Sequence, residues 1–166
     1  MEDRYLYRAK RTDNGEWVEG FIGIHTFIPP EESGKETYLG TVIEKVPERI
    51  YDCESYEVDE STICQCTGLK DKNGKLIWEN DILMGHGNPK DIAKVVFGEF
   101  FVINVETLER IDKVVGWHYE VIPTDAISKC DPFCIPMPLT DEYIERCEFE
   151  VIGSAVDNPE LLEVEE

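Results

Sequence analysis

Two close pairs of cysteines carry the chemistry that is easiest to name in this chain, because four thiolates can hold zinc in a tetrahedral site. The pairs are Cys64-x-Cys66 and Cys130-x-x-x-Cys134. Neither has the Cys-x-x-Cys spacing of a zinc knuckle, and in a strand positions 64 and 66 point to the same face. We therefore expect reduced, buried or partly buried thiols instead of a zinc site or a disulfide, and we predict no metal and no cofactor.

The three histidines, His25, His86 and His118, lack the close spacing of metalloprotease motifs. His86, between Gly85 and Gly87, is the best catalytic candidate, because loops carry sites and imidazole transfers protons near neutral pH. A solvated loop histidine explains it more simply. No serine stands in a nucleophile elbow. We therefore predict no catalytic, cofactor-binding or metal-binding residue and no enzymatic activity, and the alternative is an unrecognised hydrolase.

The formal charge of −20, from 36 acidic and 16 basic side chains, limits the partners of the chain. Residues 1–83 carry 10 basic and 18 acidic side chains, and residues 84–166 carry 6 and 18, so the acidity is spread over the surface. Such a surface repels phosphate, and we predict no binding of nucleic acid. The chain starts with charges where a signal peptide is apolar, and no apolar run approaches ~20 residues. We predict a cytoplasmic protein that does not contact membranes.

Short runs of β-branched and aromatic residues alternate with turn residues along most of the chain. Asp13-Asn14-Gly15 and Asn73-Gly74 predict two hairpin turns, since Asn and Gly tolerate positive φ. Gly98-Glu99 predicts a third, tight turn between two short strands. Asp71-Lys-Asn73-Gly74 begins like a calcium loop but lacks the other ligand positions, so we interpret it as a turn only.

These patterns predict a mainly β fold: a short-stranded small barrel of the SH3-like kind, or a sandwich, with β-hairpins and a few short helical turns. We expect one helical turn or a loop at residues 106–113, a short helix at residues 141–146, and either a helix start at Pro159 or a docked tail at residues 158–162. The other predicted strands are residues 37–46, 49–53, 92–97, 100–105, 114–122 and 148–154.

Three segments of the chain resemble the YopX family of phage and prophage proteins. They are the first hairpin with Trp17-Val-Glu-Gly20, the run from Tyr56 to Leu83, and Phe149-Glu-Val-Ile-Gly153 followed by Asn158-Pro-Glu-Leu-Leu162. Where the family usually has Gly, this chain has Asn80, which accepts left-handed backbone geometry. Asp81 is placed to accept hydrogen bonds from the amides of that turn. The resemblance implies one domain over residues 1–166, with residues 1–53 as an optional amino-terminal β subdomain and 54–166 as a barrel-like core.

The family has no established biochemical activity, so the resemblance implies a phage or prophage origin but no reaction. We expect a phage- or prophage-encoded accessory protein that acts through protein–protein contacts, self-associates as a homo-oligomer and meets a host or phage protein. The charge suggests the alternative of an acidic protein that mimics nucleic acid and inhibits a basic DNA-binding protein.

Overall fold

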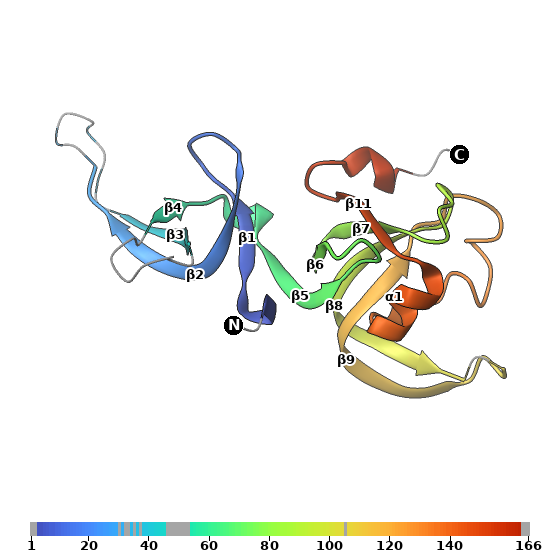
Figure 1. Cartoon of the computed structure of the whole chain (residues 1–166). Helices are drawn as coiled ribbons and strands as arrows, with labels where there is room; N and C mark the ends of the chain where they lie inside the picture. Colours follow the sequence, from blue (N-terminus) through green and yellow to red (C-terminus); the bar gives the residue numbers. More distant parts are fainter. Residues whose placement is uncertain are drawn as a thin grey trace. The chain divides into compact units, whose positions relative to one another are not determined.

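The computed structural model describes residues 3–29, 31, 34, 36, 38–45, 54–104 and 106–163. The chain falls into two units, residues 1–66 and 67–166, each with its own internal packing (Figure 1). The single domain and the boundary after residue 53 that the sequence suggested stay predictions. No helix in the described ranges is long and apolar enough to cross a membrane.

The first unit is an antiparallel sheet in which the predicted first hairpin, β1 and β2, lies between the other strands. Its strand order is β4-β3-β2-β1-β5, and β5 begins in this unit and ends in the next. Gly15, with φ of +73°, turns the chain between β1 and β2 as predicted. The strands are β1 (Tyr7–Lys10), β2 (Trp17–Phe27), β3 (Tyr38–Glu44), β4 (Ser55–Glu57) and β5 (Cys64–Lys70), with the short 3-10 helices η1 (Asp3–Tyr5) and η3 (Glu60–Thr62). The strand predicted at residues 49–53 lies outside the described residues.

A small apolar core holds this unit together. Ala9, Val18, Ile43 and Val58 are buried against one another from four separate segments. Gly20 permits the close approach of β2 and β3, because a Cβ there would lie 2.0 Å from the backbone oxygen of Glu44. The packing of this unit therefore follows from strand alternation together with one position that only glycine fits.

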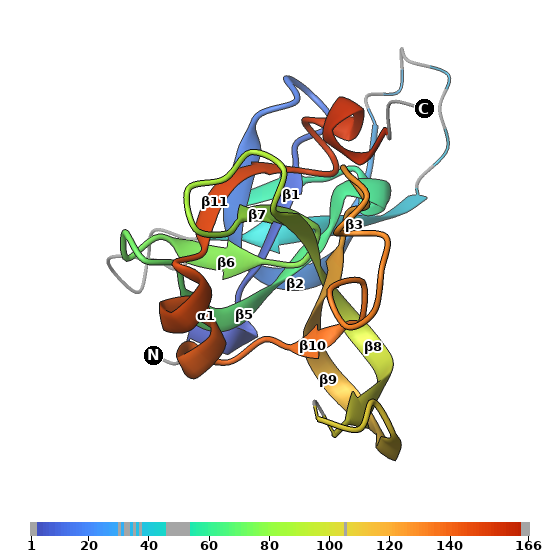
Figure 2. The same cartoon turned by 90° about the vertical axis from the view of Figure 1, so that its right-hand side faces the viewer.

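The second unit is built around a five-stranded antiparallel sheet with the order β10-β9-β8-β7-β11. The helix α1 belongs to this unit (Figure 2). Its Ile144 is buried in the same apolar cluster as Tyr119 and Phe149. The end of β5, which pairs with β6, enters the same unit. The elements are β6 (Leu76–Trp78), β7 (Asp81–Met84), β8 (Ile92–Ile103), β9 (Arg110–Val121), β10 (Met137–Pro138), α1 (Asp141–Cys147), β11 (Glu150–Ser154) and the 3-10 helix η4 (Pro159–Leu162).

The mainly β fold class is confirmed. In the parts of the chain that the structure describes, each sheet ends in two edge strands, so neither sheet closes into a barrel. The helix predicted at residues 141–146 and the helix start at Pro159 are also confirmed, as α1 and η4.

The turn predicted at Asn73-Gly74 is confirmed, and it joins β5 to β6. Gly74 has a φ of +82°, and the Asp71 amide donates to the Lys75 carbonyl at 2.8 Å. The next turn follows the predicted chemistry as well. Asn80 has a φ of +64°, and Oδ2 of Asp81 accepts a hydrogen bond from the Trp78 amide at 2.9 Å.

The turn predicted at Gly98-Glu99 is wrong, because β8 runs straight through both residues. Gly98 pairs with Gly116 of β9, and the antiparallel ladder continues on both sides of this pair. The chain reverses instead at residues 104–109, where the Asn104 amide donates to the Glu109 carbonyl and Leu108 has a φ of +60°. The helical turn considered for residues 106–113 is therefore a tight turn followed by the start of β9.

Candidate functional site

A cavity of about 590 Å³ lies within the second unit and is the strongest candidate for a site. Volumes of this order are typical of small-molecule pockets. Its walls come from the loop after β7, from β8 and β9, from the connection that precedes β10, and from the end of α1. Apolar side chains such as Ile127, Phe133 and Met137 form most of the wall, and a few polar groups stand among them.

His86, the sequence's best catalytic candidate, lies on the wall of this cavity beside Asp91. Its Nδ1 lies 2.7 Å from Oδ2 of Asp91, and its backbone amide donates to the Cys147 carbonyl at 2.7 Å. Gly85 makes room for this pair, because a Cβ there would lie 2.5 Å from Oδ2 of Asp91. The carboxylate orients the imidazole and leaves Nε2 as the nitrogen that can exchange a proton.

The side chains on the cavity wall that could act as nucleophiles are poorly activated. Burial raises the pKa of the Cys147 thiol, and the negative charge of Asp91 raises it further, so the thiol stays protonated at neutral pH. The hydroxyl of Ser128 donates to the carbonyl and carboxylate of Asp125. Burial also raises the pKa of Tyr119, which keeps its hydroxyl protonated. The geometry therefore suits binding better than covalent chemistry.

The cysteine pairs are not assembled into a metal site in the described ranges. Cys64 and Cys66 are both buried on β5 in the first unit, on the same side of the strand as predicted. Cys130 and Cys134 belong to the second unit, where Sγ of Cys134 donates to Asp131 at 3.1 Å and this contact raises the pKa of the thiol. No group of three or more His, Cys, Asp or Glu side chains in the described residues has an arrangement that could hold a metal ion. The absence of zinc stays a prediction.

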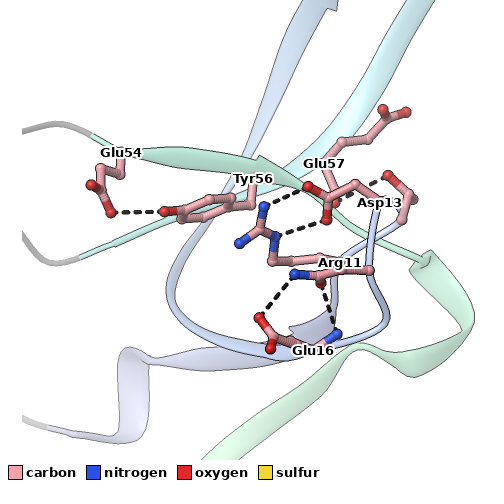
Figure 3. Close-up of polar contacts among 8 residues, drawn as sticks. Arg11, Asp13, Glu16, Glu54, Tyr56 and Glu57 are labelled. Atoms are coloured by element: carbon pink, nitrogen blue, oxygen red, sulfur yellow. Dashed lines mark hydrogen bonds and ion pairs between the residues drawn. The ribbon is translucent and has the colours of Figure 1, made fainter.

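The carboxylates at one end of the first unit are engaged with cations and with a tyrosine (Figure 3). The guanidinium of Arg11 binds Asp13, which lowers the pKa of that carboxyl, and it lies 4.0 Å from the centre of the Tyr56 ring. The hydroxyl of Tyr56 donates to Glu54 at 2.8 Å, and Lys45 binds the same carboxylate at 3.2 Å. The acidic surface that the sequence predicted is therefore partly neutralised here.

An exposed apolar surface lies on the long hairpin of β8 and β9. The ladder from β7 reaches β8 only at Ile92–Lys94, and β10 pairs only with His118 and Tyr119 of β9. Beyond these ladders the two strands continue as a two-stranded ribbon (Figure 1). One side of the ribbon carries Phe97, Phe101, Val115 and Trp117, which we call the ribbon face.

The ribbon face is apolar and locally balanced in charge. Phe97 is 50% exposed and Val115 63% exposed, and Phe97 packs edge-on against Trp117 with ring centres 5.0 Å apart. The charged side chains there compensate one another, since Lys113 binds Glu99 in an ion pair. Arg110 lies 4.2 Å from the centre of the Phe101 ring. Phe97 and Phe101 are exposed because the ribbon extends beyond the ladders of β7 and β10, whereas Trp117 is half-buried and packs against the core of the second unit.

The comparisons with known proteins point to a family without a described reaction. No curated protein matches the chain. A crystal structure of protein EF1440 from Enterococcus faecalis is 23% identical, with coverage of 95% of this chain and 96% of that chain and a TM-score of 0.41. The family model described as YopX protein matches residues 6–163, which is nearly the whole chain. The chain therefore belongs to the YopX protein family.

Proposed function

We propose that this protein is a non-enzymatic accessory protein, encoded by a phage or prophage, that acts through protein–protein contacts in the host cytoplasm and associates with a second copy of itself. The ribbon face carries this proposal. Phe97, Phe101 and Val115 are exposed there beside the half-buried Trp117, and large exposed apolar patches mark interaction surfaces.

The charge of the ribbon face favours a second copy over a basic partner. The chain as a whole has a net charge of −20, so most of its surface repels a copy of itself. At the ribbon face, however, Glu99 is paired with Lys113, and Arg110 covers Phe101. Two such faces can meet about a two-fold axis without bringing unpaired carboxylates together, and two-fold dimers are the commonest homo-oligomers. A basic partner would find few unpaired carboxylates here.

Sedimentation equilibrium over a range of protein concentrations tests self-association. We expect the wild type to form a dimer and Val115→Ser to shift the equilibrium toward monomer, because the substitution removes exposed apolar area without changing the charge. Ile24→Ser is the matched control, since Ile24 is 71% exposed on β2 and lies outside the ribbon face. A wild type that stays monomeric at every concentration, or equal weakening by both substitutions, contradicts the proposal.

Salt separates this proposal from the acidic-mimic alternative. Screening weakens the repulsion between two chains of the same charge, so self-association should strengthen between about 0.05 and 0.5 M salt. Binding to a basic DNA-binding protein should weaken over the same range, because the attraction is screened. The paired carboxylates around Arg11 and Lys45 make the second behaviour the less favoured one. The phage setting is tested separately by the identity of the genes that flank the coding sequence.

A further inference from the structure

The wall of the cavity in the second unit includes exposed apolar side chains. Ile127 is 62% exposed and Phe133 is 60% exposed, yet both line the cavity together with Met137. Both side chains come from the connection between β9 and β10, which Asp125 fixes by accepting hydrogen bonds from the Ile127 and Ser128 amides. An apolar ligand body in the cavity would remove this surface from water, which is favourable.

Two cations on the cavity wall, Arg146 and Lys90, are in none of the ion pairs between the residues that the structure describes. Asp91 is hydrogen-bonded to His86, and Asp125 is hydrogen-bonded to backbone amides and attracted by Lys90, so both carboxylates are engaged. Arg146, in the last turn of α1, makes no ion pair with any residue in the described ranges. Its guanidinium lies 5.2 Å from the centre of the Tyr143 ring, which also lines the cavity.

From this arrangement we infer that the cavity binds a small carboxylic acid with an apolar body, such as a medium-chain fatty acid. The aliphatic chain lies against Ile127, Phe133 and Met137, and the carboxylate pairs with the guanidinium of Arg146. A planar guanidinium recognises a carboxylate through two parallel hydrogen bonds. This inference uses a surface apart from the ribbon face, so it stands or falls independently of self-association.

Amide chemical-shift titrations with three probes test the inference: octanoate, 1-octanol and acetate. We expect octanoate to bind and to shift the amides of residues that line the cavity. Octanol should bind more weakly because it lacks the charge, and acetate should not bind because it lacks the apolar body. Arg146→Gln should weaken octanoate binding about tenfold and leave octanol binding unchanged. Phe133→Ser should weaken the binding of both probes.

Two control substitutions test whether the loss of a charge or of an apolar side chain outside the cavity changes octanoate binding. Lys129→Gln removes the same charge from an exposed position in the connection before β10 that does not line the cavity, and Ile24→Ser removes an exposed apolar side chain from the first unit. Neither should change octanoate binding. The inference is overturned if octanoate does not bind at millimolar concentration, if its shifts fall outside the cavity, or if Arg146→Gln and Lys129→Gln weaken binding equally.

Discussion

At the scale of single residues, Asp71 explains why two distant segments of the YopX resemblance occur together. Its Oδ1 accepts hydrogen bonds from the amides of Asn73 and Lys75 at 2.8 and 2.9 Å and thereby closes the turn between β5 and β6. Its Oδ2 accepts from the amide of Val151 in β11 at 3.0 Å. The next residue, Lys72, adds an ion pair with Glu150 at 2.8 Å. One buried carboxylate therefore joins the signature turn to the last strand, which gives the motif a structural role.

Replacing Asp71 should destabilise the protein strongly. Asp71→Ala leaves three backbone amides without their acceptor, and we expect the free energy of unfolding to fall by about 3 kcal/mol. Asp71→Asn keeps one acceptor oxygen, so it should lower the free energy of unfolding by less than Asp71→Ala does. Urea unfolding measures both effects as shifts of the midpoint at an unchanged slope. Glu142→Ala, which removes an exposed carboxylate on α1, should change the stability by less than ~0.5 kcal/mol. Equal effects of the Asp71 and Glu142 variants would argue against this role.

At the scale of elements, the long ribbon of β8 and β9 decides what the second unit presents to a partner. Gly98 lies within β8 opposite Gly116, and a Cβ there would meet its nearest neighbour, a carbon of the His118 ring, at an ordinary 3.8 Å. Gly74 differs, because its φ of +82° is a conformation that L side chains rarely adopt. Gly98 therefore stands in a strand position that tolerates a side chain, whereas Gly74 stands in a turn position that disfavours one.

The same substitution at these two glycines should change stability in opposite directions. Gly74→Ala should lower the free energy of unfolding by about 1 kcal/mol, because alanine is strained at positive φ. Gly98→Ala should raise it by about 0.5 kcal/mol, because alanine restricts the unfolded chain and fits the strand. Thermal and urea unfolding of the two variants against the wild type provide the measurement. A loss of stability in both variants would show that β8 is bent or crowded at Gly98.

At the scale of the whole molecule, the net charge of −20 sets the long-range behaviour of the chain. Several of its few cations already make contacts within the chain. Lys72 is paired with Glu150, and Arg8 and Lys10 lie over the Trp17 ring at 4.7 and 5.6 Å from its centre. Little positive surface is therefore left to neutralise phosphates and release their counterions, which is the main source of non-specific nucleic-acid affinity.

We expect the protein to bind neither duplex nor single-stranded nucleic acid at physiological salt. Electrophoretic mobility shifts in about 0.15 M salt should show no retarded complex at micromolar protein, because repulsion acts over a Debye length of roughly 8 Å. The control is Lys72→Glu, which should leave this result unchanged. Retardation by the wild type that Lys72→Glu reduces would instead reveal a local basic patch, and it would contradict our preference for protein partners.

The sequence by itself determined the features that depend on local backbone preference and on composition. Gly15, Gly74 and Asn80 take positive φ where the turn chemistry predicted it, and the YopX resemblance follows from the motif residues. The tertiary structure decided what depends on distant partners. Gly98 has the residue type of a turn, but its pairing with Gly116 keeps it in a strand.

The candidate cavity also depends on contacts between distant parts of the chain, so the tertiary structure decides it. His86 and Asp91 are close in the sequence, whereas Phe133 and Arg146 reach the same cavity from the connection after β9 and from α1. Local sequence patterns do not predict such contacts, because the contacts form only when the sheet brings separate segments together. The sequence could therefore name His86 as a candidate, but only the folded chain shows the apolar wall and the arginine beside it.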